Sequence, residues 1–194
     1  MEEYGVYVCK SDFKFNCAHF IAFQGYRERL HGHNYLLSVK MMGDSTLGDD
    51  GYCIDFGDIK KIVRSLCKSI NEYFLCPMLS DAIVISENEE QLCLECEDGS
   101  KFSFPKKDCA LLPLRHTSAE ELARYFWCRI IRTIGLSVLQ QRKIVSMEIT
   151  VAEAPMQQAI YRSVLPSSEE ELLFKEMNPP QFRPRPCSEK HEDS

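Results

Sequence analysis

Apolar and polar residues alternate over two segments near the N-terminus, and this alternation predicts two neighbouring β-strands. The first segment, around residues 11–19, ends in His19; the second begins at about Leu30 and continues with His31 and His33. Successive side chains of a strand point to opposite faces of a sheet, so residues two apart share a face. We therefore expect His31 and His33 to project together. The apolar or aromatic positions of the two strands are Phe13, Phe15, Cys17, Tyr35, Leu37, Val39 and Met41.

Two later segments have the spacing of amphipathic helices. Asp55 is placed to cap the first, whose apolar positions recur at helical intervals from Ile59 to Phe74. The run Thr117-Ser118-Ala119-Glu120 has the spacing of a capping box and begins the second helix. Gly135 is suited to end that helix, because glycine readily adopts the backbone conformation of a helix C-terminus.

Further strand patterns complete the predicted domain. Residues 82–104 are typical of an inserted β-ribbon around an Asp-Gly turn, and alternation returns over Val145–Glu153 and Ala159–Leu165. The order ββααββ with this insertion, at about 80–110, predicts one domain over residues 1–166. The proline-rich, acidic remainder, 167–194, is expected to be mostly a flexible tail, with a short helix over Ser168–Met177 left open.

Composition and charge narrow the class of protein. The 194 residues are 44% apolar and 27% charged, which is typical of a globular domain with its own core. A net charge of −6 without any basic run argues against nucleic acid as a partner. No apolar stretch approaches the ~18 residues of a membrane span, and the acidic start Met1-Glu2-Glu3-Tyr4 differs from a signal peptide. We therefore expect a cytoplasmic protein without membrane association.

The ten cysteines are scattered along the chain, which favours reduced thiols over a disulfide framework. Cys93 and Cys96 form a single CxxC motif, but alternation places it inside a strand. We therefore interpret it as structural rather than as a metal or redox site.

Three of the five histidines form the candidate centre. If the first two strands pair in antiparallel fashion, the end of one meets the start of the other, and His19 joins His31 and His33. Three imidazoles suit zinc and leave a fourth position for water or substrate, as in catalytic zinc sites. The alternative, that each histidine is a separately hydrogen-bonded polar residue, stays open on these residues alone.

Three separated motifs carry a family resemblance: Phe15-Asn16-Cys17-Ala18-His19-Phe20, Leu30-His31-Gly32-His33-Asn34-Tyr35 and Ile54-Asp55-Phe56. Residues from about 8 to 165 resemble the 6-pyruvoyltetrahydropterin synthase and 6-carboxytetrahydropterin synthase family. The resemblance implies the α+β tunnelling fold, ββααββ, with an antiparallel sheet, two helices on one face and here an inserted β-ribbon. It also implies a catalytic Zn²⁺ held by His19, His31 and His33. Further implications are the substrate 7,8-dihydroneopterin triphosphate and a homo-hexamer, a dimer of trimers with active sites between subunits.

The motif around the second and third histidines departs from the usual family pattern. Most members carry a cysteine base four residues before the first histidine of His-Gly-His, and Arg27 stands there. Glu28 follows, giving a Glu-x-x-His-Gly-His variant that resembles relatives from malaria parasites. We expect Glu28 to act as the general base. The alternative is a surface carboxylate paired with Arg27 or Arg29, two residues that are also candidates to bind the triphosphate.

Other polar residues match substrate-contacting positions of the family. Glu153 ends an apolar strand, and its carboxylate could accept two parallel N–H groups of a pterin. Ser118 and Glu120 match a further pterin-contacting segment, although helix capping is the stronger interpretation for both.

The proton relay of the family is altered in this sequence. Asn71 and Glu72 stand where an Asp-His pair is usual, and His116 is the candidate replacement as a proton shuttle, with a helix-flanking surface histidine as the alternative.

The leading hypothesis is a zinc-dependent lyase that forms 6-hydroxymethyl-7,8-dihydropterin for folate synthesis. A first alternative keeps the substrate but eliminates triphosphate to give 6-pyruvoyltetrahydropterin, as in tetrahydrobiopterin-type pathways; the missing cysteine at position 27 argues against it. A second alternative is a catalytically inactive pterin- or zinc-binding paralogue.

Overall fold

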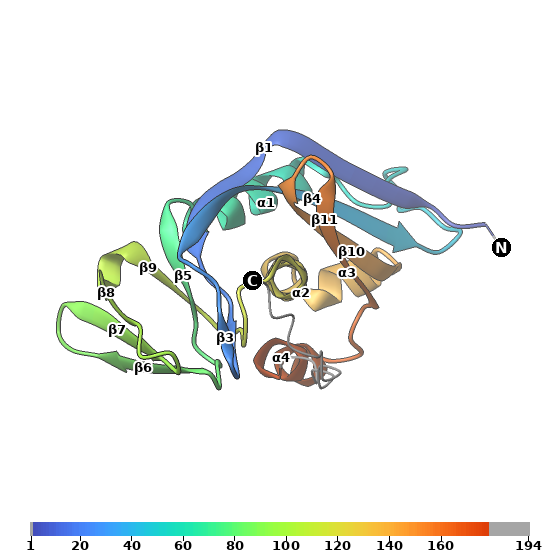
Figure 1. Ribbon diagram of the computed structural model, residues 1–194. Coiled ribbons are helices and arrows are strands. Elements are labelled where there is room, and N and C mark those ends of the chain that lie inside the picture. The colour runs from blue at the N-terminus through green and yellow to red at the C-terminus, as the bar shows by residue number, and fades with distance from the viewer. Residues whose placement is uncertain (1, 179–194) are drawn as a thin grey trace, which may run out of the picture.

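A six-stranded sheet in the order β11-β10-β4-β1-β5-β9 forms the centre of the computed structural model, which describes residues 2–178 (Figure 1). The four strands from β11 to β1 pair in antiparallel fashion, as predicted. At the other edge, β5 runs parallel to β1, and β9 runs parallel to β5. The sheet is therefore mixed rather than wholly antiparallel. Its strands are β1 (Gly5–His19), β4 (His31–Gly43), β5 (Tyr73–Pro77), β9 (Cys109–Leu112), β10 (Ile144–Ala154) and β11 (Gln157–Val164).

Helices α1, α2 and α3 lie on the inner side of the curved sheet, and α4 packs against α2 (Figure 1). Helix α1 packs against β1, and helix α2 packs against β10 and β11. Trp127 of α2 is completely buried, and its indole N–H donates to the Met147 carbonyl of β10 over 2.9 Å. The predicted α+β fold is confirmed, with more helices than the two expected. The helices are α1 (Phe56–Ile70), α2 (Ala119–Ile134), α3 (Leu136–Gln141) and α4 (Glu169–Met177).

Helix α1 ends at Ile70, so the predicted helical position of Phe74 is wrong. Asn71 leaves the helix in an extended conformation, and its side-chain oxygen accepts a hydrogen bond of 2.9 Å from the Asn16 backbone N–H. Glu72 adopts a positive φ of 68°, and its N–H donates to the Asn16 carbonyl over 2.6 Å. These bonds turn the chain onto the edge of β1, so Phe74 lies in β5. Asn71 and Glu72 thus join helix α1 to the sheet.

The cap of helix α2 lies one residue later than the spacing predicts. Ser118 is the N-cap, and its hydroxyl accepts from the Glu121 N–H over 3.4 Å. The Glu121 carboxylate in turn accepts from the backbone N–H groups of Arg115 and His116, over 3.0 and 2.9 Å. Thr117 is therefore not the cap of the helix and instead contacts His19.

The predicted insertion is a three-stranded antiparallel ribbon of β6 (Ile83–Glu87), β7 (Gln91–Cys96) and β8 (Lys101–Pro105). A short 3-10 helix, η1 (Lys106–Asp108), leads from it to β9. Two stacked ring pairs join the ribbon to the main sheet: Phe102 lies 4.8 Å from Phe20, and Phe104 lies 4.2 Å from Phe74, between ring centroids. The ribbon therefore packs on this edge of the sheet through a second apolar cluster, which the two share.

Helix α4 belongs to the folded domain, which corrects the expectation of a mostly flexible segment directly after residue 166. Ser168 caps it by accepting from the Glu171 N–H over 3.2 Å. Leu172 is completely buried in the main core, and the buried Glu176 forms an ion pair with Arg132 of α2. The rest of the expected tail, 179–194, lies outside the described residues.

The packing of α4 leads to a stability prediction. Leu172→Ala is expected to lower the free energy of unfolding by about 2–5 kcal/mol, because it opens a cavity in the core. Leu173→Ala, at the next position, removes a half-exposed side chain and should change the free energy of unfolding by less than about 1 kcal/mol. Chemical denaturation of the two variants measures the difference. Equal small effects would show that α4 does not contribute to the core.

Nine cysteines lie in the described part of the chain, and all are free thiols. Within that part, no helix is both long and apolar enough to cross a membrane.

Candidate active site

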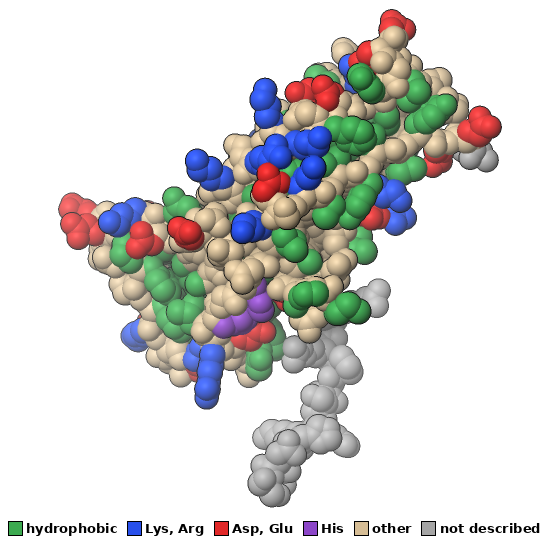
Figure 2. All heavy atoms as spheres, turned by 90° about the horizontal axis from the view of Figure 1, so that it is seen from above, with side chains coloured by type: hydrophobic (Ala, Val, Ile, Leu, Met, Phe, Trp, Pro, Cys, Tyr) green, Lys and Arg blue, Asp and Glu red, His purple; other side chains and the backbone are tan. Residues whose placement is uncertain are grey.

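The antiparallel pairing of β1 and β4 brings the three predicted histidines together. His19 lies opposite His31, and His33 lies opposite Cys17. Each histidine offers one ring nitrogen as a metal ligand, and these three nitrogens lie within 4.8 Å of one another. His19 is buried, whereas His31 is exposed, and Figure 2 shows histidine side chains at the surface of the molecule. The cluster is thus closed on one side and open to solvent on the other.

Hydrogen bonds orient two of these rings as metal ligands require. His19 Nδ1 lies 3.0 Å from the Thr117 carbonyl and 3.1 Å from its hydroxyl, and His31 Nδ1 lies 2.7 Å from the Arg29 carbonyl. A carbonyl only accepts, so each Nδ1 carries a proton and Nε2 is the nitrogen left to bind a metal. Burial, with the two neighbouring imidazoles, lowers the pKa of His19 to about 4, which keeps it neutral. The donor set fits a divalent cation such as zinc.

Gly32, between two of the histidines, permits the close approach of β1 and β4. A Cβ atom at this position would lie only 2.9 Å from the Cys17 carbonyl oxygen. Any larger residue at this position would push the two strands apart, and the opposed histidines would move apart with them.

Tyr35 connects the histidines to Glu153. Its buried hydroxyl lies 3.2 Å from His19 Nε2 and donates to Glu153 Oε1 over 3.2 Å. Burial raises the pKa of Tyr35, and the nearby carboxylates of Glu153 and Glu28 add to the rise. The phenol therefore stays protonated as a donor. The sequence pattern placed Tyr35 on the correct face but attached no role to it.

Glu28 is held at the base of the hairpin formed by β2 (Ala22–Phe23) and β3 (Tyr26–Arg27). Its backbone N–H donates to the Ile21 carbonyl over 2.9 Å, and its carboxylate accepts from the Ile21 N–H over 3.1 Å. Ile21 follows His19 by two residues and Glu28 precedes His31 by three, and His19 lies opposite His31, so this bond holds the carboxylate near the histidine end of β1 and β4. The ion pairs identified among residues 2–178 include none for Glu28, so the alternative of a paired surface carboxylate is not supported.

The Arg27 guanidinium is held by groups of the protein and is not left open to bind a triphosphate. Its guanidinium donates to Asp98, Ser100 and the Glu28 carbonyl. This corrects the expectation that Arg27 is available for an anionic substrate.

The remaining predicted residues surround the start of α2. Ser118 is occupied as the N-cap, and Glu120 is exposed on the first turn. His116 is half-buried, and burial together with Arg115 lowers its pKa. Thr117, which contacts His19, was missed because its partner lies 98 positions away in the sequence. Roles for Ser118, Glu120 and His116 in substrate contact or proton transfer stay predictions.

Comparison with known proteins agrees with this arrangement of residues. Residues 8–164 match the family described as 6-pyruvoyl tetrahydropterin synthase. The chain belongs to this family. Its members are lyases, so the protein is an enzyme with a tetrahydropterin synthase-like function. Enzymes of the 6-pyruvoyl tetrahydropterin synthase family generally depend on a metal, and this chain carries a histidine cluster able to hold one.

Individual members of the family are similar over most of their length. The putative 6-carboxy-5,6,7,8-tetrahydropterin synthase of Methanocaldococcus jannaschii is 30% identical over 155 residues, 78% of this chain and 91% of the relative. The 6-pyruvoyl tetrahydropterin synthases of Plasmodium vivax and Plasmodium falciparum are 42% and 40% identical, with TM-scores of 0.80 and 0.81. Both matches cover 84% of this chain and 99% of the other. Two P. vivax structures are described as catalytic residue mutants, with a glutamate replaced by alanine or cysteine.

Proposed function

We propose that the protein is a zinc-dependent lyase that cleaves the side chain of 7,8-dihydroneopterin triphosphate and releases 6-hydroxymethyl-7,8-dihydropterin, a folate precursor. The observation that carries this proposal is the Glu28 carboxylate, which is bonded to Ile21 near the histidine end of β1 and β4 and follows directly on the position where most of the family carries a cysteine. A glutamate is described as a catalytic residue of the P. vivax enzyme, which is 42% identical to this chain, and this supports a catalytic role for Glu28.

Zinc is the metal that the donor set suits best. His19, His31 and His33 would hold it through one ring nitrogen each, leaving a fourth position open to the substrate. When bound, the ion would act as a Lewis acid on an oxygen of the substrate side chain.

Glu28 would remove the proton that starts the cleavage. Loss of the proton from the C2′ hydroxyl turns that carbon into an aldehyde as the C1′–C2′ bond breaks, and a two-carbon aldehyde leaves with the triphosphate. The electron pair left on C1′ is delocalised into the C6–N5 imine of the dihydropterin. Return of a proton to C1′ gives the hydroxymethyl group, so the reaction needs no water or oxidant. A carboxylate is suited to this task because it can carry the same proton in both directions.

Glu153 would hold the pterin ring. Its carboxylate is half-buried at the end of β10, and one oxygen accepts from Tyr35. The paired N–H groups of the pterin pyrimidine edge match the two oxygens of a carboxylate. Tyr35 would thus orient the anchor relative to the histidines.

Product analysis tests the proposed reaction. Purified, zinc-loaded protein is incubated with 7,8-dihydroneopterin triphosphate, and the pterin products are identified by mass. We expect 6-hydroxymethyl-7,8-dihydropterin as the main product. A 6-pyruvoyl product would replace the proposal with the elimination reaction, and bound but unchanged substrate would indicate a binding protein.

Replacing the anchor tests the assignment of Glu153. Glu153→Gln is expected to weaken binding of 7,8-dihydroneopterin by about 10- to 100-fold, because the amide presents a donor where the ring also donates. Glu148→Gln, on the same strand, removes a carboxylate that pairs with Arg162 and should leave binding unchanged. Fluorescence titration measures the affinity of each variant for 7,8-dihydroneopterin. Equal affinities in the two variants would show that the pterin ring is held elsewhere.

We further propose that the enzyme assembles as a homo-hexamer and acts in the cytoplasm. The six-stranded sheet has strands β11 and β9 at its edges, and unpaired strand edges favour pairing with other subunits. Light scattering of the purified protein gives the assembly size.

A further inference from the structure

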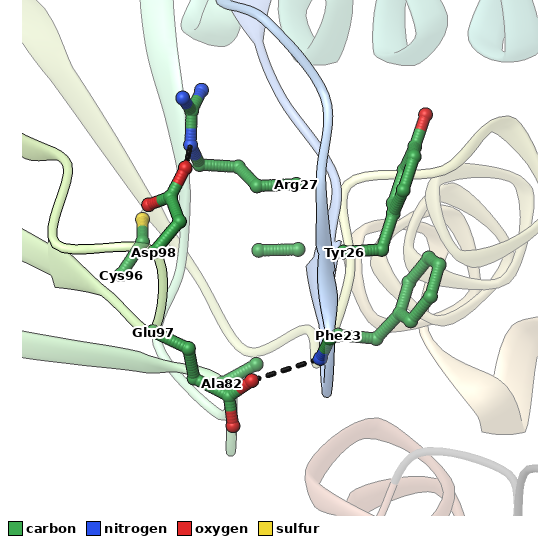
Figure 3. A pocket seen from close by; sticks show the side chains of 9 residues that line it. Phe23, Tyr26, Arg27, Ala82, Cys96, Glu97 and Asp98 are labelled. Carbon is green, nitrogen blue, oxygen red and sulfur yellow. Dashed lines mark hydrogen bonds and ion pairs between the residues drawn. The ribbon is translucent and has the colours of Figure 1, made fainter. Parts of the chain in front are cut away.

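The hairpin that carries Glu28 depends on contacts outside itself. Its strands β2 and β3 have two residues each, and an isolated hairpin of this size is not stable in water. At its tip, the Gly25 N–H donates to Glu97 Oε2 over 2.9 Å, and Glu97 lies in the turn between β7 and β8 of the ribbon (Figure 3). The inserted ribbon therefore holds the tip of the hairpin.

Arg27 makes the second connection, at the end of the hairpin next to Glu28. Its Nε donates to Asp98 Oδ2 over 2.8 Å (Figure 3), and its Nη2 donates to Ser100 Oγ over 2.9 Å. Its Nη1 donates over 2.7 Å to the backbone carbonyl of Glu28. One guanidinium thus links the ribbon turn directly to the residue proposed as the base.

The surroundings of Arg27 hold this arrangement in place. The side chain is only 18% exposed, and its guanidinium carbon lies 5.5 Å from the centroid of the Phe102 ring and 6.0 Å from that of Phe20. Asp98 is oriented by its other oxygen, which accepts from the Ser100 N–H over 3.0 Å. A partly desolvated arginine with several fixed acceptors has little freedom to move.

A pocket of about 310 Å³ lies between the hairpin and the ribbon turn, bordered by Arg27, Asp98, Glu97 and Tyr26 (Figure 3). The hairpin is thus fastened to the ribbon at two points, with open space beside them. Loss of either connection would leave room for the hairpin to shift, and Glu28 would shift with it.

We propose that Arg27 is a positioning residue that, together with the turn between β7 and β8, holds the Glu28 carboxylate in place for proton transfer. This inference rests on the proposed role of Glu28 as the base. It gives both the inserted ribbon and Arg27 a function at the site. A displacement of about 1 Å of a catalytic group is enough to cost up to 10²-fold in rate.

The first experiment compares two arginines that each form an ion pair with an aspartate, Arg27 and the more exposed Arg64. Arg27→Ala is expected to lower kcat by about 10- to 100-fold with little change in KM, because the substrate contacts remain. Arg64→Ala is the control. Arg64 also pairs with an aspartate, Asp12, over 2.7 Å, and its guanidinium carbon lies 5.8 Å from the centroid of the Phe13 ring. Arg64 belongs to α1, far along the sequence from the hairpin. It should keep the kcat of the unaltered enzyme. Arg27→Lys should recover only a minor part of the loss, because one ammonium cannot reproduce the planar arrangement of donors.

The second experiment tests whether Arg27 acts through Glu28 or through an unrelated loss of structure. In a Glu28→Gln background, Arg27→Ala should lower kcat by less than about 2-fold, because the group that it positions has already been lost. A further 10-fold loss in that background would mean that Arg27 acts through something else and would overturn the inference.

Amide hydrogen exchange provides a readout that does not depend on turnover. Arg27→Ala should speed exchange of the Ile21 and Glu28 N–H groups at least about 10-fold, whereas Arg64→Ala should not. If Glu28→Gln is inactive while Arg27→Ala keeps full kcat and slow exchange, the inference fails and the proposed function stands. If Glu28→Gln itself keeps its activity, the proposed function fails first.

Discussion

Glu28→Gln is expected to lower kcat by about 10²- to 10⁴-fold while leaving the protein folded. Glutamine keeps an oxygen that can accept from the Ile21 N–H, so the local structure should persist. It has no basic oxygen at neutral pH, and the full contribution of general base catalysis is lost. Steady-state kinetics with 7,8-dihydroneopterin triphosphate, together with a melting curve, measures the two properties separately.

A control for this prediction replaces a carboxylate on the inserted ribbon. Glu95 is exposed on β7 and pairs with Lys101 over 3.1 Å, so Glu95→Gln should change neither kcat nor stability appreciably. If Glu28→Gln kept more than about a tenth of the original kcat, another group would have to remove the proton. His116, half-buried beside the start of α2, would then be the next residue to replace.

His31→Ala is expected to reduce metal affinity at least 100-fold and to abolish measurable turnover. Loss of a group that only orients a metal ligand already costs about 10- to 100-fold in affinity, so loss of a ligand should cost more. His31 is exposed, and its replacement should not disturb the core. Metal content after dialysis, measured by mass spectrometry, and activity at increasing zinc concentration give the two readouts.

Asn34→Ala provides the control on the same strand. Asn34 lies three residues after His31 on β4, pairs with Asn16 across the strands, and is exposed on the opposite face from His33. This variant should bind metal with unchanged affinity. Equal metal content in both variants would show that the histidine cluster is not the metal site.

The two predictions separate the parts of the site. Loss of His31 should remove the metal and turnover together, whereas loss of Glu28 should leave the metal in place. If Glu28→Gln also lost the metal, the carboxylate would act as a ligand rather than as a base, and the proposed mechanism would have to change.

Periodic features were predictable from the sequence because they depend on residues close together along the chain. The two-residue period of a strand places His31, His33 and Tyr35 on one face whatever surrounds them. Antiparallel pairing of consecutive strands then brings His19 opposite His31. The inserted ribbon was predictable for the same reason, since its strands adjoin in sequence and turn at Asp98 and Gly99.

Features that depend on distant partners were decided by the tertiary structure. Helical periodicity continues to Phe74, but the helix ends at Ile70 because the Asn71 side chain accepts a hydrogen bond from Asn16 of β1, 55 positions away. No local pattern relates Tyr35 to Glu153, which lies 118 positions later.

The same distinction applies to the charged residues at the site. Sequence alone showed that Arg27 and Glu28 depart from the usual family pattern, but not where either side chain points. Arg27 could pair with its neighbour or bind a substrate anion; folding instead brings Asp98, 71 positions away, within 2.8 Å. A long, flexible side chain is directed by whichever acceptors the fold places around it. The sequence therefore determined which groups are available for chemistry, and the tertiary structure decided which of them act together.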